Sequence, residues 1–215
     1  MLPEPTVFIV DDDEEVRQSL RWLVESVRLA TETYATAQEF YQSYQPHRPG
    51  CLLLDVRMPG MSGLELQERL VAKQIRLPII IITGHADVRM AVRAIKAGAV
   101  DFIEKPFSDQ ALLDRIQAAI AQDLKLRAVD SRRAVIADRL KSLTAREREV
   151  LDLVIGGQAN REIADTLDVS CKTVEAHRAR IMKKMEADNL ADLMRELFLS
   201  GAYRMDKDSP PLLAE

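Results

Sequence analysis

The chain of 215 residues has only two cysteines, Cys51 and Cys171, which lie far apart in the sequence. Such a pair provides neither a disulfide framework nor a set of zinc ligands, and it indicates a reducing compartment. No apolar run approaches the roughly 18 to 20 residues of a membrane span, and the N-terminus MLPEPT lacks a basic, apolar signal segment. We therefore expect a cytoplasmic protein without membrane insertion.

An excess of positive charge is also lacking, since the net charge is -4 with 30 Lys and Arg against 34 Asp and Glu. Any binding to nucleic acid must therefore come from a local basic surface and not from the charge of the whole chain. The length permits one large domain or two modest ones, and the patterns below favour two.

The stretch CLLLDVRMPGMSG, residues 51–63, organises the first part of the chain. Its unbroken apolar run from Cys51 to Leu54 predicts a strand that is buried on both faces of a parallel sheet. Asp55 follows at the end of this strand, where open parallel sheets bind their ligands. A single aspartate at such a position is most simply a turn cap, so its role depends on what lies at the other strand ends.

Strands are expected near residues 7–10, 31–34, 51–54, 78–82 and 100–104, and each is followed by a helical pattern. This strand-helix order, repeated five times, predicts a doubly wound five-stranded parallel sheet with helices on both faces. A charged stretch without Gly or Pro follows and predicts a helical linker at 125–142. Its partial apolar stripe of Ile136, Leu140 and Leu143 is too sparse for a coiled-coil seam, so a solvated connector is the simpler interpretation.

The ends of four predicted strands carry Asp11 and Asp12, Asp55, Thr83, and Lys105. Mg²⁺ is typically held by one or two carboxylates together with phosphate oxygens and water. Asp55 is then placed to attack phosphorus as a carboxylate nucleophile, with positive charge from Lys105 and a hydrogen-bond donor from Thr83. The alternative is a structural ion pair between Lys105 and these acids. That alternative is the better one for any single residue, whereas the whole set favours phosphoryl chemistry.

Three short helices are expected after residue 143, with start signals at Thr144, Asn160 and Ser170. Gly156 and Gly157 stop the first of them. The third helix, CKTVEAHRARIMKKM, has one acid, Glu175, and five basic residues, Lys172, Arg178, Arg180, Lys183 and Lys184. Two short helices followed by a basic one predict an all-α helix-turn-helix unit whose third helix enters the major groove. The alternative is a solvated amphipathic helix.

Residues 4–124 resemble the receiver domain of bacterial two-component response regulators, with a flavodoxin-like fold, and we expect this domain to span residues 1–124. The resemblance is carried by VDDD at 10–13, LLLDVRMPGMSG at 52–63, ITGH at 82–85 and DFIEKPF at 101–107. Asp13 extends the acid pair usual in that family to three, and we expect it to be a helix cap. The resemblance implies that Asp55 accepts phosphate from a sensor histidine kinase. The other implied roles are Mg²⁺ binding by Asp11, Asp12, Asp55 and the backbone carbonyl of Arg57, switching by Thr83 and Phe102, tuning of phosphate lifetime by Arg57 and His85, and a cis bond between Lys105 and Pro106.

Residues 141–200 resemble the LuxR-type DNA-binding domain through LTAREREVL, GG-x-x-NREIA and TVEAHRARIMKKM, and we expect this domain to span residues 143–203. The resemblance implies base contacts from Glu175, Ala176, Ala179 and Arg180, and phosphate contacts from Lys172, Thr173, His177 and Lys183. Packing beneath the helix is the alternative for His177. The helix at 190–199 is similar to the dimerisation helix of that family, and residues 204–215 are expected to form a disordered tail.

Both resemblances together identify a regulator of the FixJ/NarL group, with sequence motifs that most resemble those of FixJ. They imply a transcription regulator, not an enzyme acting on other substrates, that dimerises when phosphorylated and binds promoter half-sites in double-stranded DNA, with RNA polymerase as a further partner. One alternative is a DNA-binding regulator whose receiver needs no phosphate. Another is an Mg²⁺-dependent phosphatase with Asp11 as nucleophile and Asp13 as acid.

Overall fold

The computed structural model describes residues 4–84, 87–201 and 203. His85 and the predicted tail at 204–215 therefore lie outside the described residues. By its internal contacts the chain divides into two compact units, Met1–Arg127 and Ala128–Glu215. No helix within the described ranges is both long and apolar enough to cross a membrane.

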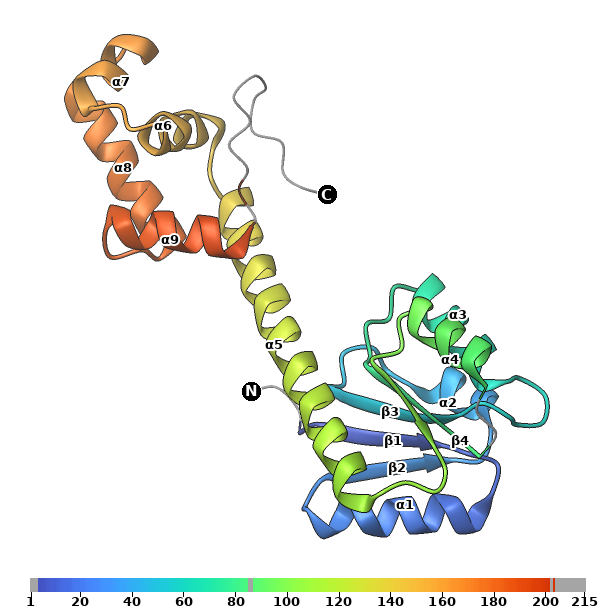
Figure 1. Cartoon of the computed structure of the whole chain (residues 1–215). Coiled ribbons are helices and arrows are strands. Elements are labelled where there is room, and N and C mark those ends of the chain that lie inside the picture. Colours follow the sequence, from blue (N-terminus) through green and yellow to red (C-terminus); the bar gives the residue numbers. More distant parts are fainter. Residues whose placement is uncertain (1–3, 85–86, 202, 204–215) are drawn as a thin grey trace. The chain divides into compact units, whose positions relative to one another are not determined.

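The first unit is built on the predicted five-stranded parallel sheet, with strand order β2-β1-β3-β4-β5. Helices alternate with the strands along the chain, which confirms the predicted doubly wound α/β fold (Figure 1). The strands are β1 (Thr6–Val10), β2 (Ala30–Tyr34), β3 (Gly50–Asp55), β4 (Ile79–Thr83) and β5 (Asp101–Glu104). The helices are α1 (Glu14–Ser26), α2 (Ala37–Ser43), α3 (Gly63–Ala72), α4 (Val88–Lys96) and the first part of α5 (Asp109–Lys141).

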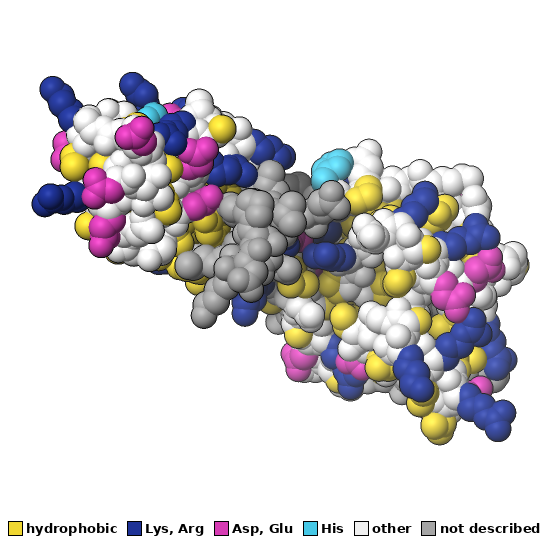
Figure 2. All heavy atoms as spheres, turned by 90° about the horizontal axis from the view of Figure 1, so that it is seen from above, with side chains coloured by type: hydrophobic (Ala, Val, Ile, Leu, Met, Phe, Trp, Pro, Cys, Tyr) yellow, Lys and Arg dark blue, Asp and Glu magenta, His cyan; other side chains and the backbone are white. Residues whose placement is uncertain are grey.

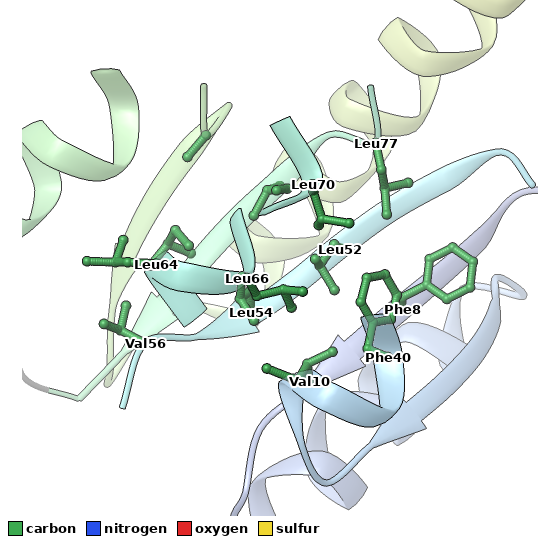
Figure 3. Packing of buried hydrophobic residues seen from close by; sticks show 14 of the residues in the cluster. Phe8, Val10, Phe40, Leu52, Leu54, Val56, Leu64, Leu66, Leu70 and Leu77 are labelled. Atoms are coloured by element: carbon green, nitrogen blue, oxygen red, sulfur yellow. The ribbon is translucent and has the colours of Figure 1, made fainter. Parts of the chain in front are cut away.

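Both faces of the sheet are covered, as the continuous apolar strands predict. Phe8 of β1 and Leu52 of β3 pack on the side of α2 and α3, where Phe40 and Leu66 approach them (Figure 3). The alternate residues of the same strands pack under α1 and α5, because successive side chains of a strand point to opposite faces. Every residue of β3 is consequently buried, including Asp55 at its end.

The second unit is all-α, and it buries one apolar cluster between its helices. The helices are α6 (Ala145–Ile155), α7 (Asn160–Leu167), α8 (Cys171–Met185) and α9 (Leu190–Ser200). The predicted capping box is present at the start of α6, where Thr144 Oγ1 accepts from the Glu147 N–H and Glu147 Oε2 accepts from the Thr144 N–H. Gly156 and Gly157 follow the end of α6, as predicted.

The linker stretch is helical, because α5 continues to Lys141. The prediction of a solvated connector is wrong for its apolar stripe, since Ile136 and Leu140 are 1% and 2% exposed and belong to the core of the second unit. Arg139 adds a polar contact there by donating from Nη1 to the Met185 carbonyl at 3.1 Å. The stripe has few apolar residues of its own, and the residues that bury it lie on helices much further along the chain.

Candidate functional site

The sequence-predicted strand-end residues line one crevice of about 280 Å³ in the first unit. It lies where the parallel strands end, and Thr83 is the last residue of β4. The lining residues are Asp11, Asp12, Asp13, Val16, Asp55, Arg57, Thr83, Gly84 and Lys105. The side chains at four separate strand ends thus come together as the sequence predicts.

The Lys105 ammonium group contacts the carboxylates of two of these acids. Its Nζ is 2.7 Å from Asp11 Oδ2 and 3.4 Å from Asp55 Oδ1. The ion pair between Lys105 and these acids, which was the alternative to a role in phosphoryl chemistry, is therefore present. It does not exclude a chemical role, because the same ammonium group borders the crevice and is free to exchange one carboxylate oxygen for a phosphoryl oxygen. The Lys105–Pro106 bond is cis, as predicted.

Asp55 combines burial with an acidic neighbour. Burial and the charge of Asp11 raise the pKa of the Asp55 carboxyl above its ordinary value, against the lowering effect of the Arg57 N–H and Lys105. Its Oδ2 accepts from the Arg57 N–H at 2.6 Å, whereas the contact of Oδ1 with Lys105 is long. Oδ1 is therefore the less constrained oxygen of this carboxylate.

The loop after β1 presents three acids in different ways. Asp11 is 3% exposed and Asp12 is exposed. Asp13 caps α1, because its Oδ1 accepts from the N–H groups of Glu15 and Val16 at 2.9 and 3.3 Å. This confirms the prediction that Asp13 is a helix cap, and it leaves Asp11, Asp12 and Asp55 as the carboxylates available to a cation.

No three His, Cys, Asp or Glu side chains are grouped as a metal site anywhere in the described ranges. The crevice nevertheless fits Mg²⁺, which needs only one or two carboxylates and keeps several waters. Asp11 and Asp55 already share one cationic group, the Lys105 ammonium, so their oxygens lie on a common side of the crevice. An all-oxygen donor set of this kind suits a hard cation.

Thr83 and Phe102 lie on neighbouring strands and on the same face of the sheet. Phe102 pairs with Ile81, two residues before Thr83, and alternation places 81 and 83 on one face. Thr83 is 1% exposed, while Phe102 is half-buried against the core on the side of α2 to α4. The two predicted switch residues are thus close in register.

Helix α8 turns one side to solvent. Ser170 caps it as predicted, since its Oγ accepts from the Thr173 N–H at 3.1 Å. Val174, Ile181 and Met185 are buried on its inner side. Thr173 and His177 are partly buried, and His177 Nδ1 is enclosed with no hydrogen-bond partner among the described residues. The exposed residues among those predicted to contact DNA are Lys172, Glu175, Ala176, Ala179, Arg180 and Lys183.

Two of the five basic residues on α8 have partners inside the unit, which the sequence did not indicate. Arg178 Nη1 donates to Asn160 Oδ1 at 2.9 Å. Asn160 is the first residue of α7 and not its cap, so the capping prediction is wrong. At the start of α7 the Glu162 carboxylate instead provides a hydrogen-bond acceptor. Its Oε2 accepts from the backbone N–H of the cap residue Ala159 at 2.7 Å.

Lys184 is the second such residue. Its Nζ donates to Glu147 Oε2 at 2.6 Å and to the Ser142 carbonyl at 2.9 Å. This hydrogen bond, together with the Thr144 N–H, lowers the pKa of Glu147 to about 2. Glu147 is itself buried, so the pair fixes α8 against the start of α6. Lys172, Arg180 and Lys183 remain as the exposed basic residues of α8, and Lys and Arg side chains stand out from the surface of the second unit in Figure 2.

A receiver-type sheet with an acidic crevice, combined with a helix-turn-helix unit, defines a two-domain regulator. The response regulator receiver domain matches residues 7–117, and the luxR family of bacterial regulatory proteins matches residues 141–197. The chain belongs to the response regulators that join a receiver domain to a LuxR-type DNA-binding domain, and it acts in two-component regulation of transcription.

Individual relatives agree with this assignment over most of the chain. The transcriptional regulatory protein FixJ of Azorhizobium caulinodans is 41% identical over 95% of this chain and 97% of its own length. The solved structure of the response regulator StyR is 44% identical, with a TM-score of 0.86 over 91% of this chain and 98% of that one. The crystal structure of full-length FixJ from B. japonicum is 40% identical, with a TM-score of 0.56 over 92% of this chain and 97% of that one.

Proposed function

We propose that Asp55 is the phosphoacceptor and that its phosphorylation controls dimerisation and DNA binding. The observation that carries this proposal is the position of Lys105 Nζ between Asp11 Oδ2 and Asp55 Oδ1. An oxygen of Asp55 attacks phosphorus, the bond from phosphorus to the nitrogen of the kinase's phosphohistidine breaks, and an aspartyl phosphate forms. The partner is a sensor histidine kinase.

The remaining crevice residues have supporting roles in this transfer. Lys105 supplies positive charge to a phosphoryl oxygen, and Thr83 donates a hydrogen bond to the same group. Asp11, Asp12, Asp55 and the carbonyl of Arg57 would hold Mg²⁺, and Arg57 also tunes phosphate lifetime. Bound Mg²⁺ would offset the negative charge of the transferring group. The chain thus catalyses only phosphoryl transfer to itself and the later hydrolysis, and the use of Asp13 as the α1 cap argues against a phosphatase that needs it as an acid.

Phosphorylation is read out by Thr83 and Phe102, which reorient together and change the surface formed by α4 and β5. Val88, Val92 and Ile95 of α4 and Val100, directly before β5, are exposed apolar side chains of this surface. We propose that it pairs with the same surface of a second chain. Arg93 lies beside it and contacts Glu68 of its own chain at 2.6 Å, an exposed pair that is weak enough to be exchanged for one between chains.

DNA recognition falls to the exposed side of α8. Ala176 and Ala179 are small enough to let the helix lie deep in the major groove, and Arg180 and Glu175 flank them with a donor and an acceptor. Glu175 accepts from cytosine N4, and Lys172, Thr173, His177 and Lys183 contact phosphates. Helix α9, with exposed Phe198 and Leu199, supports a dimer on adjacent half-sites. We further propose that the protein is cytoplasmic and that it activates transcription through RNA polymerase.

The test compares wild type with Asp55→Asn by intact mass and size-exclusion chromatography, in Mg²⁺ with acetyl phosphate. We expect one phosphoryl adduct and a shift to dimer, both absent in Asp55→Asn. Operator affinity measured in the same samples should rise only for the phosphorylated wild type. Equal operator affinity with and without the adduct would instead support a regulator whose receiver needs no phosphate.

A further inference from the structure

Arg17 makes a contact with the acidic loop that no sequence motif pointed to. It lies on α1, one helical turn after the cap residue Asp13. Its Nη1 donates to the carbonyl oxygen of Asp11 at 2.8 Å and to that of Asp12 at 2.9 Å. One guanidinium nitrogen therefore holds two consecutive peptide groups of the loop that carries the acid pair.

The orientation of these peptide groups decides where the Asp11 carboxylate points. A trans peptide is planar, so its C=O and N–H point in opposite directions. With the Asp12 carbonyl turned to Arg17, the N–H of Asp13 is turned away from Arg17, and it donates to Asp11 Oδ1 at 3.0 Å. The other carboxylate oxygen of Asp11, Oδ2, is held by Lys105. One peptide plane thus links the Arg17 guanidinium to the Asp11 carboxylate that borders the crevice.

We propose that Arg17 is a positioning residue for cation binding. It orients the Asp11 and Asp12 peptide groups so that the Asp11 carboxylate can coordinate Mg²⁺. This inference rests on the proposed function of the crevice. Groups that orient metal ligands by hydrogen bonds typically contribute a factor of about 10 to 100 in metal affinity. Loss of Arg17 should therefore weaken binding.

The direction of the change in Mg²⁺ affinity on removing Arg17 distinguishes a positioning role from a purely electrostatic one. Arg17 is a cation beside a cation site, so by Coulomb's law alone its removal would strengthen Mg²⁺ binding. The positioning role predicts the opposite. A loss of fold stability would lower the amount of active protein, but it would not change the Mg²⁺ concentration that half-saturates the remaining molecules.

The experiment uses the full chain as wild type, Arg17→Met and Arg21→Met. Arg21 is the matched control, because it is an exposed arginine on the same helix whose 2.7 Å pair with Glu25 is remote from the acidic loop. The first readout is Mn²⁺ affinity by electron paramagnetic resonance, without phosphodonor. The second is the rate of adduct formation from acetyl phosphate as a function of Mg²⁺ concentration, which separates half-saturation from the rate at saturation.

For Arg17→Met we expect about a tenfold rise in the Mn²⁺ dissociation constant and in half-saturating Mg²⁺, with a nearly unchanged saturating rate. Arg21→Met should stay within about twofold of wild type on both readouts, as expected for an exposed residue outside the site. If Arg17→Met does not fold, as judged by circular dichroism, Arg17→Gln is measured in its place with the same expectation.

Two results would overturn the inference while leaving the proposed function intact: wild-type or tighter Mn²⁺ binding by the Arg17 variant, or an equal effect of Arg21→Met. If the wild type itself binds no Mn²⁺ and forms no adduct, the inference and the proposed function are both wrong.

Discussion

Gly63 lies so close to the end of β3 that a Cβ atom at this position would be 2.1 Å from the carbonyl oxygen of Asp55. The Gly63 N–H also donates to the Val56 carbonyl at 3.0 Å, so the start of α3 packs directly on the strand end that carries the proposed phosphoacceptor. Only a residue without a side chain permits this approach. The close approach is consequently part of the architecture of the crevice.

Gly63→Ala should destabilise the first unit and displace Asp55. Neither the Asp55 backbone nor α3 can yield without losing core contacts, so we expect a cost of about 1 to 3 kcal/mol or more, typical of overpacking. Hydrogen exchange of peptides from β3 in rising urea measures this cost, and intact mass measures the accompanying loss of adduct. Gly84→Ala is the control for stability, since a Cβ at 84 in the same crevice meets nothing within 4 Å. Wild-type stability of Gly63→Ala would contradict the prediction.

The Glu147–Lys184 pair should make the second unit sensitive to acid. The pKa of Glu147 is about 2 in the folded chain, against an ordinary value of 4.5, so the unfolded chain takes up this proton more readily. The stabilisation is therefore complete above about pH 4.5 and is lost as the pH falls toward 2. We expect the difference in unfolding free energy between wild type and Glu147→Gln to shrink from pH 6 to pH 3, as measured by hydrogen exchange of α6 and α8. The same substitution at exposed Glu149 should show no comparable trend.

Lys172→Ala should weaken DNA binding without changing sequence preference. Lys172 is exposed at the start of α8, where we propose a phosphate contact. The loss of one such contact lowers the slope of log affinity against log salt concentration by about one unit, equally for operator and random DNA. Fluorescence anisotropy over a salt series measures both slopes, with exposed Lys125→Ala on α5 as the control. A change in the ratio of operator to random affinity would instead assign Lys172 to base reading.

The two cysteines should react very differently with iodoacetamide. Burial raises the pKa of the Cys51 thiol to about 12, whereas Cys171 is exposed at the start of α8. Since the thiolate is the reactive form, we expect native protein to take one label, and Cys171→Ser to take none until it is unfolded. Peptide mass mapping identifies the labelled residue. Rapid labelling of Cys51 in native protein would mean that β3 is less protected than its burial indicates.

Much of the fold and of the candidate site could be predicted because the signals are local. An apolar run such as Cys51–Leu54 indicates a strand buried on both faces, and the carboxyl ends of parallel strands must meet at one edge of their sheet. Asp11, Asp55, Thr83 and Lys105 were therefore predicted to lie at one edge of the sheet, while the strand order that places them in one crevice came from the structure. The caps at Asp13, Thr144 and Ser170 were equally predictable, since a cap bonds to residues two or three positions away.

Contacts between residues far apart in the sequence could not be predicted from local patterns. Arg178 bonds to Asn160, Lys184 to Glu147, and Ile136 packs into the second unit, although composition marked these residues as DNA-facing or solvated. The turn of Arg17 toward two backbone carbonyls has no sequence signature either. A long side chain on a helix has several partners within reach, and the choice between them depends on which other elements pack beside it. Local sequence patterns therefore specified which elements form and which strand ends carry the polar side chains of the crevice, while packing between distant elements set which charged groups stay exposed.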